Sequence, residues 1–286
     1  MSGLSSTSAR ACSGHPDPGL LTPEHNTPHA NGKPFLGHAP TLGAAGKPSQ
    51  RTAGAGRMTR ARESCEKKLA IRASSLYDWR MLMRKYTGGE LSCNGYLLPG
   101  MNGEYVAVDA PTGFAKWVQS QLPAGARLAH LLLTHQHFDH IADAAALQAA
   151  TGCAIHACRP YTPALTLCMH ARQWSIPLPP AFQVDDTLGD QDSTATWAGW
   201  RWQLLHVPGH SIDSMVYYLP DADLLFAGDV LFAGSIGRTD LAGGSHAQLT
   251  AGIRRKLLTL PPATDVYPGH GPATSVQEEE INNPHL

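Results

Sequence analysis

The 286-residue sequence lacks several features that would assign it to a common class of protein. It has no run approaching the ~20 consecutive apolar residues that a membrane-spanning helix needs, so no membrane partner is expected. Its six cysteines form no Cys-x-x-Cys pair and no dense framework, which favours reduced thiols in an intracellular protein over a disulfide scaffold. No Gly-x-Ser-x-Gly segment is present, so the sequence does not support a serine nucleophile.

Charge is divided unevenly along the chain. Residues 1–85 contain 13 Lys and Arg against 5 Asp and Glu, whereas the remaining residues contain 9 against 18. Nucleic-acid phosphates need a basic surface, so the acidic body argues against a nucleic-acid substrate.

The basic N-terminal segment has the composition of a disordered leader. Residues 1–57 are rich in Ser, Thr, Ala, Gly and Pro without apolar periodicity, and they contain no apolar core of a secretory signal peptide. An organellar transit peptide and a mis-assigned start codon both remain open as explanations. We expect residues 58–85 to be a basic linker and residues 86–286 to form the folded domain, located in the cytoplasm or, through the leader, in an organelle.

One short apolar run ends in a dense cluster of polar side chains. Residues 131–133 are three leucines that read as a buried strand, and His135, His137, Asp139 and His140 follow within a few positions. Asp139 is expected to cap a helix that begins there. Imidazoles and carboxylates at this density would repel when protonated and would cost desolvation free energy when buried. A bound cation removes both penalties.

The alternative explanation is a polar turn with solvated histidines, and for a single histidine it would be preferred. However, three later apolar stretches each end in a further candidate ligand, namely His210, Asp229 and His270. Strand ends in α/β proteins meet at one edge of a sheet, where ligand chemistry is commonly placed. The pattern therefore favours a metal site.

Together these residues resemble the seven-ligand set of the metallo-β-lactamase-fold hydrolases. Residues 228–229 (Gly-Asp), 234–240 (Gly-Ser-Ile-Gly-Arg-Thr-Asp) and 267–272 (Tyr-Pro-Gly-His-Gly-Pro) are most similar to the hydroxyacylglutathione hydrolase (glyoxalase II-like) branch. The resemblance covers about residues 86–286 and implies an αββα sandwich of two mixed β-sheets flanked by helices. Only 16 residues follow His270. They are too few for the C-terminal helical domain of glyoxalase II, which contributes glutathione contacts, so a smaller or different thioester is an alternative substrate.

The resemblance also implies a role for each ligand. His135, His137 and His210 would hold one divalent ion, Asp139, His140 and His270 would hold a second, and Asp229 would bridge them. Imidazole and carboxylate donors suit Zn(II), which we favour, as well as Fe(II) and Mn(II). A hydroxide between the ions would attack a small-molecule thioester or ester, with Asp139 as the catalytic group that accepts or passes the proton.

Three further residues are expected beside the ligands. Asp109 ends a predicted strand and would either support a ligand or form a turn, and Arg238 and Asp240 would form an ion pair or support the ligands. Two related activities stay open, a lactonase and a mononuclear iron persulfide dioxygenase that would use His135, His210 and Asp229. The sequence keeps all seven ligands in every case, so the set of ligands does not decide between these activities.

The other expected elements follow from hydrophobic periodicity. Tryptophans alternate with other residues over 197–202, which predicts one half-buried strand. We expect helices over 112–122 and 163–174, a helix capped by Ser245 that runs to residue 260, and a last strand at 265–267.

Overall fold

The computed structural model describes residues 82–286. The expected leader at 1–57 and most of the expected linker lie outside the described residues. The first strand, β1 (Arg84–Gly88), begins two residues before the expected start of the folded domain. Within residues 82–286, none of the helices has both the length and the apolar character needed to cross a membrane.

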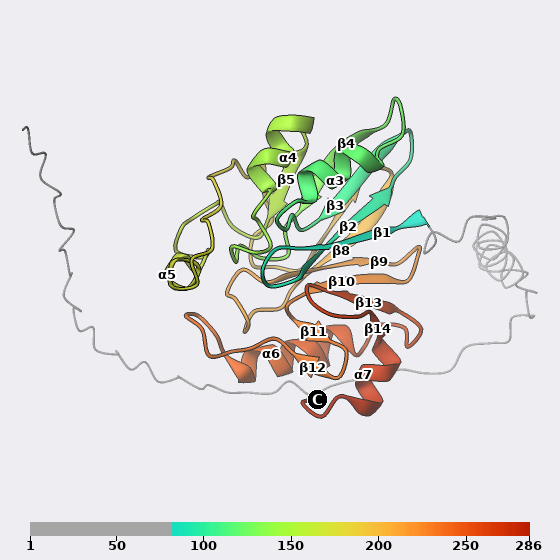
Figure 1. Cartoon of the computed structure of the whole chain (residues 1–286). Helices are drawn as coiled ribbons and strands as arrows, with labels where there is room; N and C mark the ends of the chain where they lie inside the picture. The colour runs from blue at the N-terminus through green and yellow to red at the C-terminus, as the bar shows by residue number, and fades with distance from the viewer. Residues whose placement is uncertain (1–81) are drawn as a thin grey trace, which may run out of the picture. The chain divides into compact units, whose positions relative to one another are not determined.

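Two six-stranded sheets form the centre of the fold (Figure 1). The first sheet runs in sequence order, antiparallel from β1 to β3 and parallel from β3 to β6. Its other strands are β2 (Cys93–Pro99), β3 (Glu104–Val108), β4 (Arg127–Leu132), β5 (Ala154–Ala157) and β6 (Asp186–Thr187). Both sheets are mixed, as the resemblance implied.

The second sheet has the order β14-β13-β10-β9-β8-β7, and only its β10–β13 pair is parallel. Its strands are β7 (Ser193–Trp197), β8 (Trp200–His206), β9 (Met215–Leu219), β10 (Leu224–Gly228), β13 (Asp265–Pro268) and β14 (Thr274–Ser275). A small hairpin of β11 (Leu231–Phe232) and β12 (Ser235–Ile236) follows β10.

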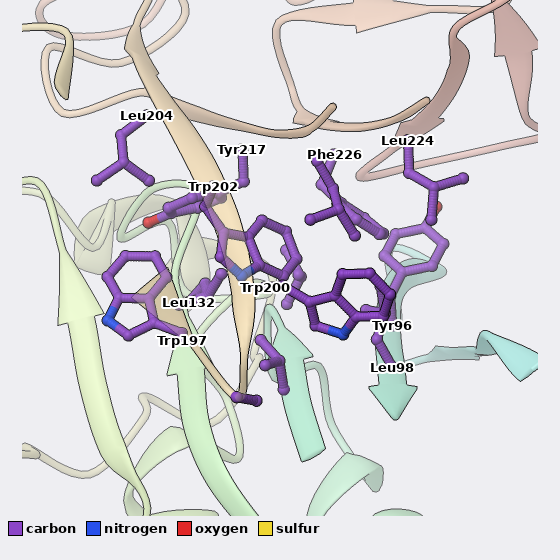
Figure 2. Packing of buried hydrophobic residues seen from close by; sticks show 14 of the residues in the cluster. Tyr96, Leu98, Leu132, Trp197, Trp200, Trp202, Leu204, Tyr217, Leu224 and Phe226 are labelled. Carbon is purple, nitrogen blue, oxygen red and sulfur yellow. The ribbon is translucent and has the colours of Figure 1, made fainter. Parts of the chain in front are cut away.

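The inner faces of the two sheets share one apolar core, drawn in Figure 2. Trp202, Tyr217 and Phe226 of the second sheet are fully buried there, with Tyr96 and Leu132 of the first sheet in the same cluster. Burial of side chains this large stabilises the pairing of the sheets, because each removes about 150–250 Å² of mostly apolar surface from water.

The tryptophan-rich stretch is a hairpin, so the prediction of one strand over 197–202 was wrong. Trp197 pairs with Trp200 across a two-residue turn at Ala198 and Gly199, whose φ angles are 49° and 80°. Two consecutive residues with positive φ are typical of a type I′ turn, the turn that best joins twisted antiparallel strands.

Helices cover the outer face of each sheet and complete the αββα sandwich. Helices α3 (Phe114–Gln121) and α4 (Ala144–Thr151) pack on the first sheet. Helix α6 (His246–Gly252), its π-helical continuation η1 (Ile253–Leu257) and α7 (Val276–Asn282) pack on the second. The Ser245 side chain accepts a hydrogen bond from Gln248 N, which confirms the expected cap of α6.

Three local predictions were wrong. The helix after the histidine cluster begins at Ala144 rather than at Asp139, because the Asp139 carboxylate faces His270 instead of capping a helix. Only α5 (Cys168–Gln173) forms within the predicted helix at 163–174. β14 and α7 follow the strand that was expected to be the last.

Candidate metal centre

All seven predicted ligands follow strand ends that meet at one edge of the two sheets. The loop after β4 carries four of them, from His135 to His140. The other three follow β8, β10 and β13 of the second sheet, at His210, Asp229 and His270. Predicted ligands from both sheets therefore converge, although 135 residues separate the first from the last.

Three histidines form the first donor group. The donor nitrogens of His135, His137 and His210 all lie within 4.8 Å of one another. His210 Nε2 is 3.0 Å from His137 Nδ1, and the His135 ring centroid is 4.4 Å from that of His137. Three imidazoles at these separations can face one ion from three sides.

Asp139, His140 and His270 form the second donor group. Asp139 Oδ2 lies 3.2 Å from His270 Nε2 and 3.7 Å from His140 Nε2. Asp229 lies against both groups, because its carboxylate oxygens are 3.3 Å from His140 Nε2, 3.5 Å from His210 Nε2 and 3.6 Å from His270 Nε2. This position suits a carboxylate that bridges two ions.

Hydrogen bonds at Nδ1 fix the orientation of four of the five histidine rings. A ring that donates from Nδ1 to an oxygen presents the lone pair of Nε2 on its other side. Two of the oxygens belong to side chains: His140 Nδ1 lies 2.8 Å from Asp109 Oδ2, and His135 Nδ1 lies 3.1 Å from Thr134 Oγ1. The other two are backbone carbonyls: His210 Nδ1 lies 2.9 Å from Arg238 O, and His270 Nδ1 lies 3.0 Å from Leu91 O. Four Nε2 lone pairs are thereby directed into the site.

Several of the inward-facing atoms have no hydrogen-bond partner. His135 Nε2, His140 Nε2 and Asp229 Oδ1 are buried and unsatisfied within the described part of the chain. Unpaired buried polar atoms cost roughly 1–3 kcal/mol each, so a cluster of them needs an explanation. Divalent cations provide one, because each would accept several of these lone pairs at once.

Ionisation in the site favours positive charge at its centre. Burial lowers the pKa of His135 far below its usual value and that of His137 to about 3, so both rings are neutral. Burial would also lower the pKa of His140, but Cys93 and the carboxylates of Asp229, Asp109 and Asp139 raise it well above the usual value. Without an ion, His140 therefore holds a proton beside the neutral rings of His135 and His137 and the ionised carboxylates of Asp139 and Asp229, and a bound cation would take the place of that proton.

Asp109 lies behind the ligands, where the sequence placed it as a supporting residue. It accepts hydrogen bonds from Thr134 N and Thr134 Oγ1, both 2.8 Å long, in addition to its contact with His140. Its φ angle of 56° is uncommon for a residue other than glycine, and the three contacts hold it in that conformation.

Arg238 and Asp240 form the expected ion pair, with Nε–Oδ1 and Nη2–Oδ2 distances of 2.7 and 2.8 Å. Both side chains are exposed, at 52% and 67%, so neither supports a ligand through its charge. The contact with the site comes instead from the backbone carbonyl of Arg238, which accepts from His210.

Two further residues lie in the site although no role there was predicted for either of them. Cys93 opens β2 and lies within 4.8 Å of the donor atoms of Asp139, His140 and His270. Gly269 passes so close that a Cβ there would collide with the carboxylate of Asp229 and the ring of His140. Both depend on the pairing of distant strands, which residue spacing does not reveal.

A cavity of about 210 Å³ opens beside Asp139. Phe138 and the apolar residues at 176–180 form one wall, and Glu90, Thr112 and Asp143 contribute polar atoms. Its lining contains no Lys or Arg, so no cationic side chain of this kind on its walls would form an ion pair with a negatively charged group.

Comparison with known proteins agrees with the geometry. Residues 91–270 match the family model described as the metallo-beta-lactamase superfamily. The chain is 34% identical to the probable metallo-hydrolase YqgX of Bacillus subtilis, over 72% of this chain and 98% of the relative. It is 34% identical to the hydroxyacylglutathione hydrolase GloC of Haemophilus influenzae, over 54% of this chain and 74% of the relative.

Solved structures share the arrangement of sheets and helices. The BLEG-1 B3 metallo-beta-lactamase and the di-iron-bound form of TTHA1623 are both 35% identical, with TM-scores of 0.65 and 0.61. Each match covers 71% of this chain, with 99% and 100% of the respective structure. ETHE1 from Myxococcus xanthus is 27% identical, with a TM-score of 0.58, over 71% of this chain and 84% of that one. The chain belongs to the metallo-beta-lactamase superfamily.

Proposed function

We propose that this protein is a dinuclear metallohydrolase that cleaves a small thioester or ester. The observation that carries the proposal is the position of Asp229, whose carboxylate lies against histidines of both donor groups. A mononuclear site would not need the second group, yet Asp139, His140 and His270 converge as closely as the first three histidines do.

The donor set fits a pair of divalent ions. His135, His137 and His210 would hold one, Asp139, His140 and His270 the other, with Asp229 shared. Imidazole and carboxylate donors favour Zn(II), with Fe(II) and Mn(II) as the alternatives. Such a pair supplies a nucleophilic hydroxide near neutral pH and a Lewis acid for the carbonyl oxygen of the substrate.

Asp139 has the environment of the catalytic proton acceptor. Burial would raise its pKa, but His140 and His270 outweigh this effect and lower it, so the carboxylate is ionised. It also lines the cavity in which the substrate would lie. Asp139 can therefore accept the proton of the attacking water and return it to the departing thiolate or alkoxide.

The cavity favours an uncharged acyl group. Its wall at Phe138 and 176–180 is apolar, and its acidic residues would repel a carboxylate. The name of GloC makes a hydroxyacyl thioester of glutathione a reasonable first probe. Thioesters that differ only in their thiol would then show how much the carrier contributes.

The first experiment measures metal content per chain together with thioester cleavage. The protein is purified without added metal, analysed for elements, and assayed with a hydroxyacyl thioester, an ester and a lactone. A β-lactam is included, because BLEG-1 is described as a B3 metallo-beta-lactamase. Two metal ions per chain with thioester or ester cleavage support the proposal. Two ions with β-lactam cleavage alone contradict the substrate class.

An Asp229→Ala variant tests the shared ligand. Because both donor groups contact this carboxylate, we expect metal content to fall for both ions and hydrolysis to fall at least ~1000-fold, or about 4 kcal/mol of transition-state stabilisation. Asp240→Ala is the matched control, since it removes an exposed carboxylate whose partner is Arg238. Full activity of Asp229→Ala would refute the bridging role.

An iron-dependent oxygenase is the second candidate. It is supported by the donor types of His135, His210 and Asp229, because two histidines and one carboxylate suit a single iron. The rings of His135 and His210 have centroids 4.9 Å apart, and His210 Nε2 lies 3.5 Å from Asp229 Oδ2. One iron per chain, no hydrolysis and oxygen uptake with glutathione persulfide would favour it over the hydrolase.

A further inference from the structure

Cys93 is held against the second donor group by backbone pairing. It opens β2 and forms an isolated antiparallel bridge with His270, and the next residue, Asn94, donates its N–H to Gly269 O at 2.7 Å. The Cys93 side chain is fully buried. Its position relative to His270 is therefore fixed by the backbone of both segments rather than by a flexible loop.

The thiol faces the same space as the second group of ligands. Cys93 Sγ and one donor atom each of Asp139, His140 and His270 all lie within 4.8 Å of one another. One sulfur, two nitrogens and one oxygen at this spacing are donor types that Zn(II) takes in proteins, and the shared carboxylate of Asp229 would be a fifth donor.

The buried sulfur has few other polar contacts. Among the described residues it lies 3.7 Å from the carbonyl of the adjacent Asn94 and otherwise contacts the ring of His140, which belongs to the second donor group. By contrast, Cys158 Sγ lies 3.2 Å from Gly189 O and 3.5 Å from Asp190 Oδ1.

We propose that Cys93 is a further ligand, which gives its thiolate to the ion held by Asp139, His140 and His270. On binding, the S–H bond breaks, a sulfur–metal bond forms, and the proton leaves to solvent, with no change in oxidation state. The inference rests on the proposed metal centre and extends its ligand set beyond the seven predicted residues. A thiolate would make the second position softer than the first, and so more selective for Zn(II) and Co(II) over Mn(II) and Mg(II).

Cobalt substitution gives a readout that is independent of catalysis. The full chain is loaded with two equivalents of Co(II), and thiolate-to-cobalt charge-transfer absorption is recorded in the near ultraviolet. We expect the band in the native chain and its loss in Cys93→Ser and Cys93→Ala. We also expect the affinity for the second cobalt ion to fall at least tenfold in both variants.

Cys153→Ala is the matched control. This thiol is also buried, but it belongs to none of the donor groups, so the variant should keep the band. Cys158→Ala tests the other thiol that lies near possible ligands, Asp190 and His206. A band that survives Cys93→Ser, or that disappears only in Cys158→Ala, overturns the inference.

If the Cys93 variants fail to fold, X-ray absorption of the native cobalt protein tests instead whether a sulfur atom is bound to cobalt. A sulfur neighbour of cobalt, retained in Cys158→Ala, supports the inference, and two bound cobalt ions without sulfur overturn it. Sulfur ligation without ester or thioester cleavage would leave Cys93 as a ligand and contradict the proposed function. Cleavage without sulfur ligation would support the proposed function and overturn the role of Cys93 as a ligand.

Discussion

The orientation of the ligand rings depends on residues that lie behind them. Asp109 accepts from His140 Nδ1 and from the hydroxyl of Thr134, and that hydroxyl can accept in turn from His135 Nδ1. One carboxylate therefore helps to orient a histidine of each donor group. Such supporting contacts keep the Nε2 lone pairs directed at the metal positions before any ion arrives.

An Asp109→Asn variant should weaken metal binding without removing a ligand. The amide keeps an oxygen but loses the charge that holds the His140 ring, so we expect roughly 10–100-fold lower metal affinity. Titration with a competing chelator measures the change. Asp143→Asn is the control, because Asp143 accepts from Ala115 N and the amide oxygen can do the same. Unchanged affinity in Asp109→Asn would contradict the supporting role.

A second histidine pair, outside the metal centre, makes stability depend on pH. His130 Nδ1 lies 3.0 Å from His156 Nε2, and His156 Nδ1 lies 3.3 Å from Asp186 Oδ2. Burial lowers the pKa of both histidines below the usual 6.5. The unfolded chain therefore binds more protons, and the stabilisation is present above about pH 6.5 and lost as pH falls through the lowered values.

Replacing His156 by Gln should flatten this dependence. The comparison is the difference in free energy of unfolding between the native chain and His156→Gln, measured in urea from pH 5 to pH 8. Contributions of the metal centre are common to both proteins and cancel in the difference. We expect the difference to shrink as pH falls. A constant difference across this range would show that the pair does not titrate as described.

At the scale of residues, the sequence predicted the donors better than their surroundings. That the seven residues bind metal stays a prediction. They could be identified as candidate donors because four follow the apolar strand β4, the other three each follow a further strand, and their chemistry is evident locally. Cys93 could not, because its position depends on pairing with His270, 177 residues away. The Arg238 side chain forms the ion pair that was one of its two expected roles, whereas the contact with His210 comes from its backbone carbonyl, and no side-chain pattern encodes such a contact.

Among the elements, the hairpin of β7 and β8 depends most on its turn. Gly199 has a φ angle of 80°, and a Cβ there would lie 2.7–2.8 Å from side-chain atoms of Met101. Both the backbone conformation and the neighbouring side chain therefore oppose any larger residue.

We expect Gly199→Ala to lower the free energy of unfolding by about 2 kcal/mol, with metal affinity unchanged. Gly125→Ala separates the cost of the positive φ angle from the cost of the contact with Met101. Gly125 has the same φ of 80°, but nothing lies within 4 Å of its added Cβ. Urea unfolding should show a smaller loss for Gly125→Ala, about 1 kcal/mol. Equal losses would mean that the contact with Met101 costs nothing.

Strands and helices with regular apolar periodicity were predictable, whereas short or interrupted elements were not. The strand before the histidine cluster and the helix capped by Ser245 have clear signals, and both form. The tryptophan hairpin was missed because the Ala-Gly pair between Trp197 and Trp200, which interrupts the alternation, was not interpreted as a turn. β14 was missed because it has only two residues, which are half-buried by pairing with β13. α7 was missed although Ser275 caps it by accepting a hydrogen bond from Glu278 N.

For the whole molecule, the donors belong to both sheets. The loop after β4 extends from the first sheet, whereas His210, Asp229 and His270 follow strands of the second. Ions bound there would join the two layers at one edge of the sandwich. The order of the layers was predictable, because the resemblance implied an αββα sandwich and the order of strands and helices along the chain suits that arrangement.

Removal of the metal should therefore destabilise the whole sandwich. An ion present at ~100 times its dissociation constant adds roughly 2.7 kcal/mol to the folded state, which corresponds to about 5–11 °C in Tm for a domain of this size. Calorimetry of the loaded protein, before and after chelation and again after metal is restored, measures the shift. Identical Tm values in the three states would contradict a structural contribution from the ions.

The separation of the donors along the chain also sets the order in which they leave a ribosome. His270 follows His140 by 130 residues. At roughly 5–20 residues per second, the loop after β4 would wait about 7–26 seconds for the last donor. During this interval His135, His137, Asp139 and His140 would be exposed to cellular metal ions while the second sheet is incomplete. Metal supply during translation, and not only the affinity of the finished site, would then influence which ion the mature protein contains.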